Sequence, residues 1–378
     1  MLRELHQALR HEIESPTDAR TLGSGWISGV GALILGLFGL AAVLCMHFPE
    51  WFGVPQIRSY YDHTWVKSGL QLALLLAFSL ASLNLVLRRS KVLGLAAIAA
   101  VLITSILATN IPAQTPDTDQ HLLGLDWLIL NLLFTGILFV PLEKVFGRIR
   151  HQALFRNEWR EDLFYFLFSS LLVQTLSYLS LWPSLTLLQH TESWAGLRAS
   201  VISQPLWLQF IEIMFLTDLV QYWFHRAFHR IPALWKFHAV HHSAKTMDWL
   251  AGSRMHLVEI IGLRSMTIIP MYLLGFHETA LYAYIVLVYL YATYIHANVR
   301  FDIEWLKPLI VTPRFHHWHH GIEKEAIDVN FAIHFPLFDR LFGTYYMPEN
   351  QWPSGYGIGG HPVPNGYWKQ FLYPFTKG

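Results

Sequence analysis

Histidine is the residue type in this chain that offers chemistry, and its spacing is informative. The 378 residues include 21 histidines, and three short blocks of them stand out. The blocks are His225–His229 (HRAFH), His238–His242 (HAVHH) and His316–His320 (HHWHH), and His296 stands alone between the second and the third. Neutral imidazole is the commonest metal ligand in proteins, so the blocks predict a metal site.

The spacing inside the blocks fits helices that present several histidines on one face. Positions three or four residues apart share a face of a helix, so the members of each block can converge on one point. The expected ligands are His225, His229, His238, His241, His242, His296, His316, His319 and His320. One metal ion takes three or four such ligands, so this set suits two ions, and iron, zinc and copper all accept imidazole. His317 falls off the shared face, and we expect it to support the ligands or to lie at the surface.

The composition predicts that these histidines belong to a membrane protein. Hydrophobic residues make up 53% of the chain and charged residues 14%, against about a quarter charged in soluble domains. The formal net charge of +1 gives no reason to expect a nucleic-acid partner. Cys45 is the single cysteine, which excludes intrachain disulfides, thiolate zinc sites and iron–sulfur clusters within one chain.

The hydrophobic runs predict an all-α, polytopic membrane helical bundle. Runs that cross or nearly cross a bilayer occupy residues 26–48, 68–87, 92–110, 124–142, 163–187, 206–224, 257–275 and 279–295. With the N-terminus in the cytoplasm, that side receives eleven basic residues and the other side two or three, and the loop 111–121 has none. The positive-inside rule therefore favours this orientation. The expected ligands then lie at cytoplasmic ends of spans, in a histidine-rich helical cap that holds a dinuclear metal site.

The three blocks, in an apolar chain, resemble the fatty acid hydroxylase/sterol desaturase superfamily of membrane di-iron enzymes. The resemblance covers about residues 155–350 and includes DLVQYWFHRAFHR, LWKFHAVHHS, YIHANV, TPRFHHWHHG and FDRLFGTYY, in the family's order. It implies an N-terminal extension with about four transmembrane helices (1–150), a catalytic domain (151–350) and a C-terminal tail (351–378). The family's ligands correspond to the nine histidines given above. Some members have a further histidine about four residues beyond the position of His296, where this chain has Arg300.

The resemblance also implies cofactors and partners. Two iron ions are expected, with zinc able to replace them in a purified sample, and O2 is the co-substrate. No flavin, cytochrome or ferredoxin module is legible in the chain, so we expect electrons from a separate protein, a ferredoxin or a cytochrome b5 with its reductase. The expected substrate is a membrane lipid (fatty acyl, sterol-like or ether lipid), which is hydroxylated or desaturated. No catalytic side chain beyond the metal centre is expected.

Other polar residues are expected to hydrogen-bond to the ligands, because metal-binding histidines usually donate their second N–H to a carboxylate or a carbonyl. Asp218 precedes His225 by seven residues and lies near the same helix face, inside an apolar run. Weaker candidates of the same kind are Glu259, Asn298, Asp248 and Asn330. His256 stands where many members of the family carry a histidine, and we expect it to be a hydrogen-bonding partner rather than a ligand.

Three other functions compete with a lipid oxygenase. A membrane zinc hydrolase would use similar histidines, but it predicts a general-base glutamate between ligands, as in HExxH, and no block contains one. A metal transporter predicts polar or acidic residues along several spans, whereas the first four spans hold few. A non-catalytic heme or metal scaffold predicts bound metal without oxygen consumption.

Overall fold

The computed structural model describes residues 2–21, 23–109, 123–301, 303–360 and 363–376. Over these residues the chain is helical, and its only β-type pairing is an isolated bridge between Gly321 and Tyr356. The all-α prediction is therefore confirmed. The loop 111–121, which entered the prediction of orientation, lies outside the described residues.

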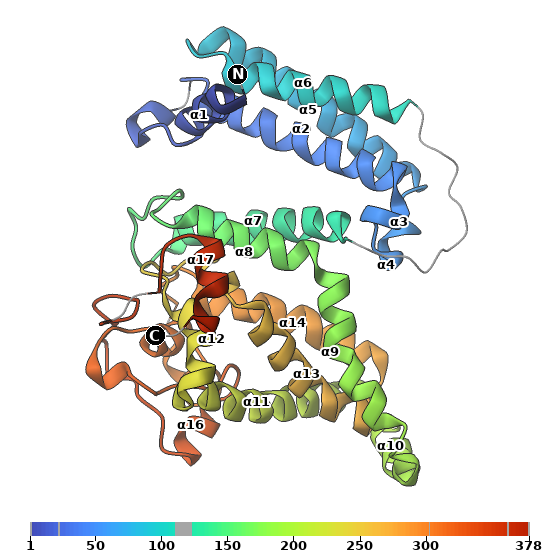
Figure 1. Ribbon diagram of the computed structural model, residues 1–378, viewed down its shortest axis with the longest axis vertical. Helices are drawn as coiled ribbons and strands as arrows, with labels where there is room; N and C mark the ends of the chain where they lie inside the picture. The colour runs from blue at the N-terminus through green and yellow to red at the C-terminus, as the bar shows by residue number, and fades with distance from the viewer. Residues whose placement is uncertain (1, 22, 110–122, 302, 361–362, 377–378) are drawn as a thin grey trace. The chain divides into compact units, whose positions relative to one another are not determined.

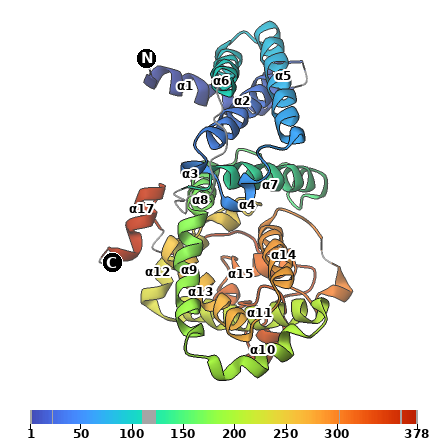
Figure 2. The ribbon, with the colours of Figure 1, turned by 90° about the vertical axis from the view of Figure 1, so that its right-hand side faces the viewer.

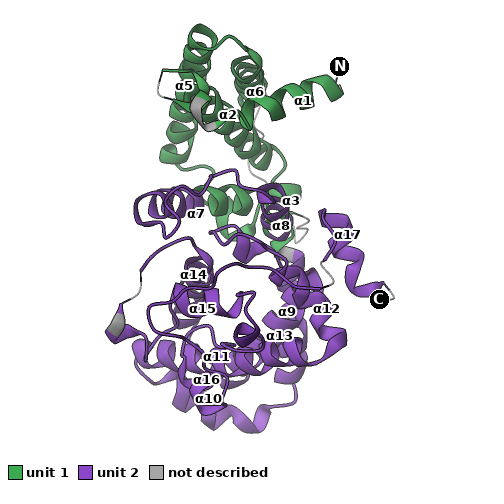
Figure 3. Cartoon of the chain, turned by 90° about the vertical axis from the view of Figure 1, so that its left-hand side faces the viewer, with its two compact units in different colours: residues 1–133, 170–174 green, residues 134–169, 175–378 purple. Residues whose placement is uncertain are grey.

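The chain folds as two compact units, which Figure 3 shows in green and purple. Unit 1 comprises residues 1–133 and 170–174, and unit 2 comprises residues 134–169 and 175–378. The main boundary thus lies at residue 133, whereas the sequence placed it at 150, and the C-terminal tail is part of unit 2. All of the expected ligands belong to unit 2.

Small residues let the helices of unit 1 approach one another closely. The elements of this unit, with η for 3-10 helices, are α1 (Leu2–Ile13), η1 (Thr17–Arg20), α2 (Trp26–His47), α3 (Pro49–Phe52), α4 (Pro55–Arg58), α5 (Thr64–Leu87), α6 (Val92–Ala108) and the first part of α7 (Leu125–Phe146). The helices α2, α5 and α6 meet at the buried residues Ala32, Ala81 and Ala97. Close packing of small side chains holds helices together where lipid removes the hydrophobic driving force.

Unit 2 is built around the long helix α11. In chain order its elements are the rest of α7, most of α8 (Trp159–Leu171) and α9 (Val173–Leu188), then η2 (Glu192–Trp194), α10 (Ala195–Ile202), α11 (Leu206–Arg230), α12 (Pro232–His242), η3 (Ala251–Ser253), α13 (Leu257–Leu274), α14 (Glu278–His296), η4 (Glu304–Leu306), α15 (Pro313–His319), η5 (Lys324–Ala326), α16 (Leu337–Leu341), α17 (Tyr367–Leu372) and η6 (Tyr373–Phe375). The helix α11 packs against α12, α13 and α14 (Figures 1 and 2). Eight of the nine expected ligands lie on α11, α12, α14 and α15, and His320 follows directly after α15.

Among the described residues, five helices are long and apolar enough to cross a membrane, which supports a multi-pass membrane protein. They are α2, α5, α7, α13 and α14. The expected span at 92–110 corresponds to α6, which has 17 residues and is shorter than these five. The expected span at 163–187 is interrupted, because α8 ends at Leu171 and α9 begins at Val173.

The expected span at 206–224 is also absent from this set, although α11 has 25 residues. Its polar side chains explain the difference. Gln209, Glu212 and Asp218 lie along this stretch, and two of them, Gln209 and Asp218, are fully buried inside unit 2. The polar groups on the buried face of α11 thus bind other parts of the protein.

Local sequence signals fix the ends of the helices that hold the site. The helix α15 begins at Pro313, and Thr312 caps it by accepting a hydrogen bond from the backbone N–H of Phe315 (3.3 Å). The side chain of His256 caps α13 in the same way. Gly275 ends α13 with a φ of +70°, a conformation that glycine adopts without strain, and the chain then turns into α14.

Candidate metal centre

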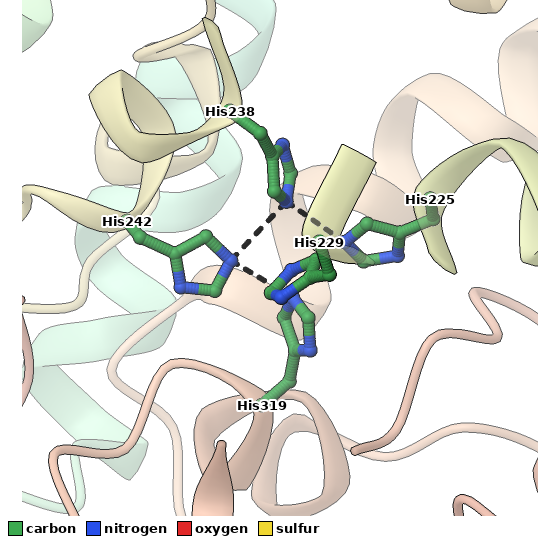
Figure 4. Close-up of side chains that lie close together, drawn as sticks. All are labelled: His225, His229, His238, His242 and His319. Carbon is green, nitrogen blue, oxygen red and sulfur yellow. Dashed lines mark hydrogen bonds between the residues drawn. The ribbon is translucent and has the colours of Figure 1, made fainter. Parts of the chain in front are cut away.

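The nine expected ligands lie in two clusters in unit 2. In each cluster, one ligand atom from every histidine lies within 4.8 Å of the others. Cluster one consists of His225, His229, His238, His242 and His319, and cluster two of His241, His296, His316 and His320. Figure 4 shows the rings of cluster one, from α11, α12 and α15, pointing toward one another. The structure thus brings together every histidine that the sequence selected as a ligand.

Each HxxHH block is divided between the two clusters. In the second block His238 and His242 join cluster one, and His241 joins cluster two. The third block is divided in the opposite sense, with only His319 in cluster one. Residues four apart differ by about 40° around a helix, whereas neighbours differ by about 100°. The expectation that each block converges on one point is therefore wrong for these two blocks, because the inner histidine faces away from the outer pair.

Backbone carbonyls fix the orientation of four ligand rings. The Nδ1–H groups of these histidines donate to carbonyl oxygens, from His225 to Phe331 (2.8 Å), from His319 to Val329 (2.8 Å), from His241 to Arg254 (3.1 Å) and from His296 to Ala292 (2.6 Å). A carbonyl can only accept, so Nδ1 carries the hydrogen and Nε2 keeps its lone pair. In all four residues the unprotonated nitrogen is the one left to bind a metal.

Carboxylates contact two further ligands. Nδ1 of His238 lies 2.5 Å from Oε1 of Glu259, and Nδ1 of His229 lies 3.3 Å from Oδ1 of Asp328. Glu259 makes the contact expected of it, whereas the sequence did not single out Asp328. The available signal was an acidic residue in a polar turn soon after the third block.

The Nε2 atoms that face the interior of a cluster lie at distances typical of nitrogens bound to one metal ion. Nε2 of His241 and Nε2 of His296 are 3.2 Å apart, and neither carries a hydrogen, because both Nδ1–H groups donate to carbonyls. Two lone pairs at this distance repel unless a positive charge lies between them. Two nitrogens bound at right angles to one ion, each about 2.1 Å from it, lie about 3 Å apart. In cluster one, Nε2 of His229 is buried without a hydrogen-bond partner in the described part of the chain. The residues present therefore fit a metal ion in each cluster.

Burial keeps the ligands in the neutral form that binds metal. It lowers the pKa of His238, His241, His242, His316, His319 and His320 well below the usual value of 6.5, and neighbouring histidines lower it further. A protonated imidazole has no free lone pair, so metal binding requires the neutral form. The fold therefore presents these rings ready to coordinate.

Asp218 acts on the protein backbone and not on a ligand. Its two oxygens accept hydrogen bonds from the backbone N–H groups of residues 333–335, at 2.8, 3.1 and 2.7 Å. The direct contact with a ligand histidine that the sequence suggested is thus absent. The carboxylate instead holds residues 333–335, which follow closely after Phe331, whose carbonyl orients His225.

His256, Asn298 and His317 also support the site indirectly. His256 caps α13, and its Nε2–H donates to a carbonyl in α17 (3.0 Å). The side chain of Asn298 exchanges two hydrogen bonds with the backbone of Ile149 (3.0 and 3.1 Å) and so fixes the turn after His296. His317 is 1% exposed, so the surface position that the sequence allowed is wrong, and its Nε2 lies 3.3 Å from the carbonyl oxygen of His296.

A buried ionic network holds the loop between α12 and α13. Asp162 pairs with both Arg156 and Arg254, and Arg156 also binds Asp248 (2.6 Å). Since the carbonyl of Arg254 accepts the hydrogen of His241, this network places a ligand of cluster two. Asp248 therefore contributes through the network and has no contact of its own with a ligand.

Asn330 also acts on the backbone and not on a ligand. Its side-chain N–H group donates to the carbonyl oxygen of Phe315 in α15 (3.0 Å).

Replacing Glu259 with alanine is expected to weaken metal binding in cluster one by about 10–100-fold, because His238 loses the carboxylate that orients it and raises its basicity. The measurement is the rate of metal loss to a chelator from the purified, metal-loaded protein. Glu278→Ala, which removes an exposed carboxylate from the first turn of α14, is the matched control. Equal rates of metal loss from the two variants would contradict this role for Glu259.

Comparison with known families identifies the region that carries both clusters. Residues 210–344 match the family model described as fatty acid hydroxylase, and this range contains all nine histidines of the clusters. This region of the chain is similar to the fatty acid hydroxylase family. The superfamily resemblance inferred from the histidine blocks is thereby confirmed.

Several curated members of this superfamily are similar to the chain. It is 28% identical over 174 residues to ornithine lipid hydroxylase OlsE of Rhizobium tropici, which covers 46% of this chain and 52% of that protein. It is 31% identical over 147 residues to the alkylglycerol monooxygenase of Homo sapiens, which covers 39% of this chain and 32% of that protein. A longer match, 23% identical over 253 residues, joins it to the lathosterol oxidase of Homo sapiens. The chain thus spans about half the length of the first relative and a third of the second. No solved structure matches the chain.

Proposed function

We propose that this protein is an O2-dependent di-iron oxidoreductase that hydroxylates or desaturates a membrane lipid. The observation that carries the proposal is the pair of buried clusters in which neutral imidazoles turn their unprotonated nitrogens toward one another. The similar proteins are named for the oxidation of an ornithine lipid, of alkylglycerols and of lathosterol, which supports a lipid as the substrate.

The bound irons would supply, with O2, the oxidising power to attack an unactivated C–H bond. In hydroxylation, one oxygen atom enters the C–H bond, and two electrons and two protons convert the other to water. In desaturation, two hydrogens leave the substrate, and both oxygen atoms end as water with the same supply of electrons and protons. We propose a separate ferredoxin, or a cytochrome b5 with its reductase, as the electron donor.

The protein's own residues would hold the metal and protect it. Carbonyls and carboxylates fix which nitrogen of each ring faces inward, and burial excludes water from the clusters. We also propose that the N-terminus and both clusters face the cytoplasm, on the basis of the basic residues in the short loops. Residues 1–150 would then anchor the catalytic part in the bilayer.

The decisive experiment is elemental analysis of the purified chain after growth in iron-supplemented medium. We expect about two irons per chain in the natural sequence and about one in the His238→Ala/His241→Ala double variant, because cluster two then keeps three histidines and loses its iron, whereas cluster one keeps four and should release its iron faster to a chelator. The double variant His151→Ala/His190→Ala, which removes two exposed histidines of unit 2, should retain both irons.

The same preparation separates the oxygenase from its main competitor. One tightly held zinc that excludes iron even after iron loading would contradict the di-iron proposal and favour a zinc hydrolase. Two bound irons without oxygen consumption, in the presence of a reductant and membrane lipids, would favour a non-catalytic scaffold.

A further inference from the structure

Arg264 places a positive charge in the middle of an apolar helix. It belongs to α13 (LVEIIGLRSMTIIPMYLL), which is long and apolar enough to cross a membrane. Glu259 is the only other charged side chain in this helix, and it contacts His238 of cluster one. Charged side chains at membrane depth are costly and are usually found where they bind a partner.

The guanidinium of Arg264 has no carboxylate partner among the described residues. Its face of α13 also carries Ile260, Thr267 and Met271, which are 7%, 8% and 6% exposed. Arg264 itself is half-buried on this otherwise buried face. The side chain therefore projects toward the protein interior and not toward the lipid side of the helix.

Arg264 interacts electrostatically with Tyr289 in α14. Tyr289 precedes His296 by seven residues, so the two side chains share a face of α14. With a rise of about 1.5 Å per residue, Arg264 lies about 7.5 Å along α13 from Glu259, and Tyr289 lies about 10 Å along α14 from His296. Both polar side chains are therefore within two helical turns of residues that touch the metal clusters.

Beyond these two side chains the interior becomes apolar. Met271, Ala280 and Tyr284 belong to a buried apolar cluster at the opposite ends of α13 and α14. From the metal clusters along the two helices, the order is thus imidazoles, then Arg264 with Tyr289, then apolar side chains. This order matches an amphiphile whose charged group lies near the metal centre.

We propose that Arg264 binds the anionic group of the lipid substrate, a carboxylate or a phosphate, through the paired N–H groups of its guanidinium. Such groups match the planar fork of arginine, and the negative charge would compensate the unpaired positive one. The inference rests on the proposed function and adds the chemical class of the substrate. It also implies that the oxidised carbon lies close to the polar end of the lipid and not at the far end of its chain.

The test compares amphiphiles with the same hydrocarbon chain and different head groups. Dissociation constants of dodecyl phosphate, dodecanoate and dodecanol are measured for the purified, iron-loaded chain in neutral detergent, together with its iron content. We expect at least one of the anions to bind about tenfold more tightly than dodecanol, and the stronger of the two identifies phosphate or carboxylate as the preferred group. Arg264→Gln should abolish this preference and leave dodecanol binding unchanged, whereas Arg264→Lys should retain part of it.

The control is Arg150→Gln, which removes an exposed arginine of the same unit and should keep the preference. An anion preference that survives in Arg264→Gln, or no preference in the natural sequence, would overturn the assignment. So would a loss of iron and of dodecanol binding in Arg264→Gln, because the residue would then be structural. Each of these outcomes overturns only the role of Arg264. The proposed function is tested separately by the iron content of the natural sequence, and it fails if that protein binds no iron.

Discussion

Replacing His316 with alanine is expected to reduce bound iron from about two per chain to about one. His316 lies in cluster two, where its Nε2 is 2.9 Å from Nε2 of His296 and 3.2 Å from Nε2 of His320. The cluster has four histidines, so the substitution leaves three, which is the minimum for one ion in a protein site. His316 contacts both His296 and His320, so its removal opens the centre of the cluster. We expect the remaining three histidines to bind iron too weakly for it to be retained during purification. Oxygen consumption with lipid should fall to background.

His229→Ala provides the informative contrast. Cluster one has five histidines, so four remain after this substitution, and both irons should be retained with a faster loss to chelator. A second control is His317→Ala, because His317 is adjacent to His316 in the chain but contacts a carbonyl oxygen and the hydroxyl of Tyr356. Loss of iron from His317→Ala as complete as from His316→Ala would show that the assignment of the ligands is wrong.

Replacing Asp218 with alanine is expected to destabilise unit 2 more than any other single change outside the metal ligands. The carboxylate is 0% exposed and accepts three backbone hydrogen bonds from residues 333–335. Each buried donor that loses its acceptor costs about 1–3 kcal/mol, so the expected loss for the three donors is about 3 kcal/mol or more. The released residues follow Phe331 closely in the chain, so the carbonyl that orients His225 loses support, and cluster one should bind iron less tightly.

The measurement is the apparent Tm of the detergent-solubilised protein, compared with two variants. Asp218→Asn keeps one acceptor oxygen and should lie between Asp218→Ala and the natural sequence. Glu212→Ala removes a half-buried carboxylate of the same helix that accepts one side-chain hydrogen bond (3.1 Å), and it should cost about 1 kcal/mol or less. Equal Tm values for Asp218→Ala and Glu212→Ala would contradict the structural role of Asp218.

The helix α11 carries buried polar groups whose partners hydrophobicity alone does not reveal. The run at 206–224 has enough apolar residues to suggest a bilayer crossing, but Gln209 and Asp218 are buried against other parts of the protein. Gln209 accepts from the backbone N–H of His277 (2.8 Å), and Asp218 binds residues 333–335. These partners are distant in the chain, so the sequence gives no local signal that the polar groups are satisfied inside the protein.

Side-chain types and their spacing were enough to predict a metal site in this chain. Residue type predicted metal ligation, and the spacing of four residues in the blocks placed pairs such as His225 and His229 on one helix face. Apolar runs predicted α13 and α14, which bring His296 back to the level of the blocks. These properties depend only on side-chain chemistry and on the helical repeat, both of which are local.

The division of the histidines between the two clusters and the orientation of their rings depend on contacts between distant segments. The assignment of His241 to cluster two and of His242 to cluster one depends on where α14 and α15 pack around α12. The choice of Nδ1 partner depends on backbone carbonyls, as in His241 with Arg254 and His319 with Val329. Every residue has a carbonyl, so a sequence carries no mark of the one that will accept a given imidazole hydrogen. Only the packing of segments far apart in the chain selects it.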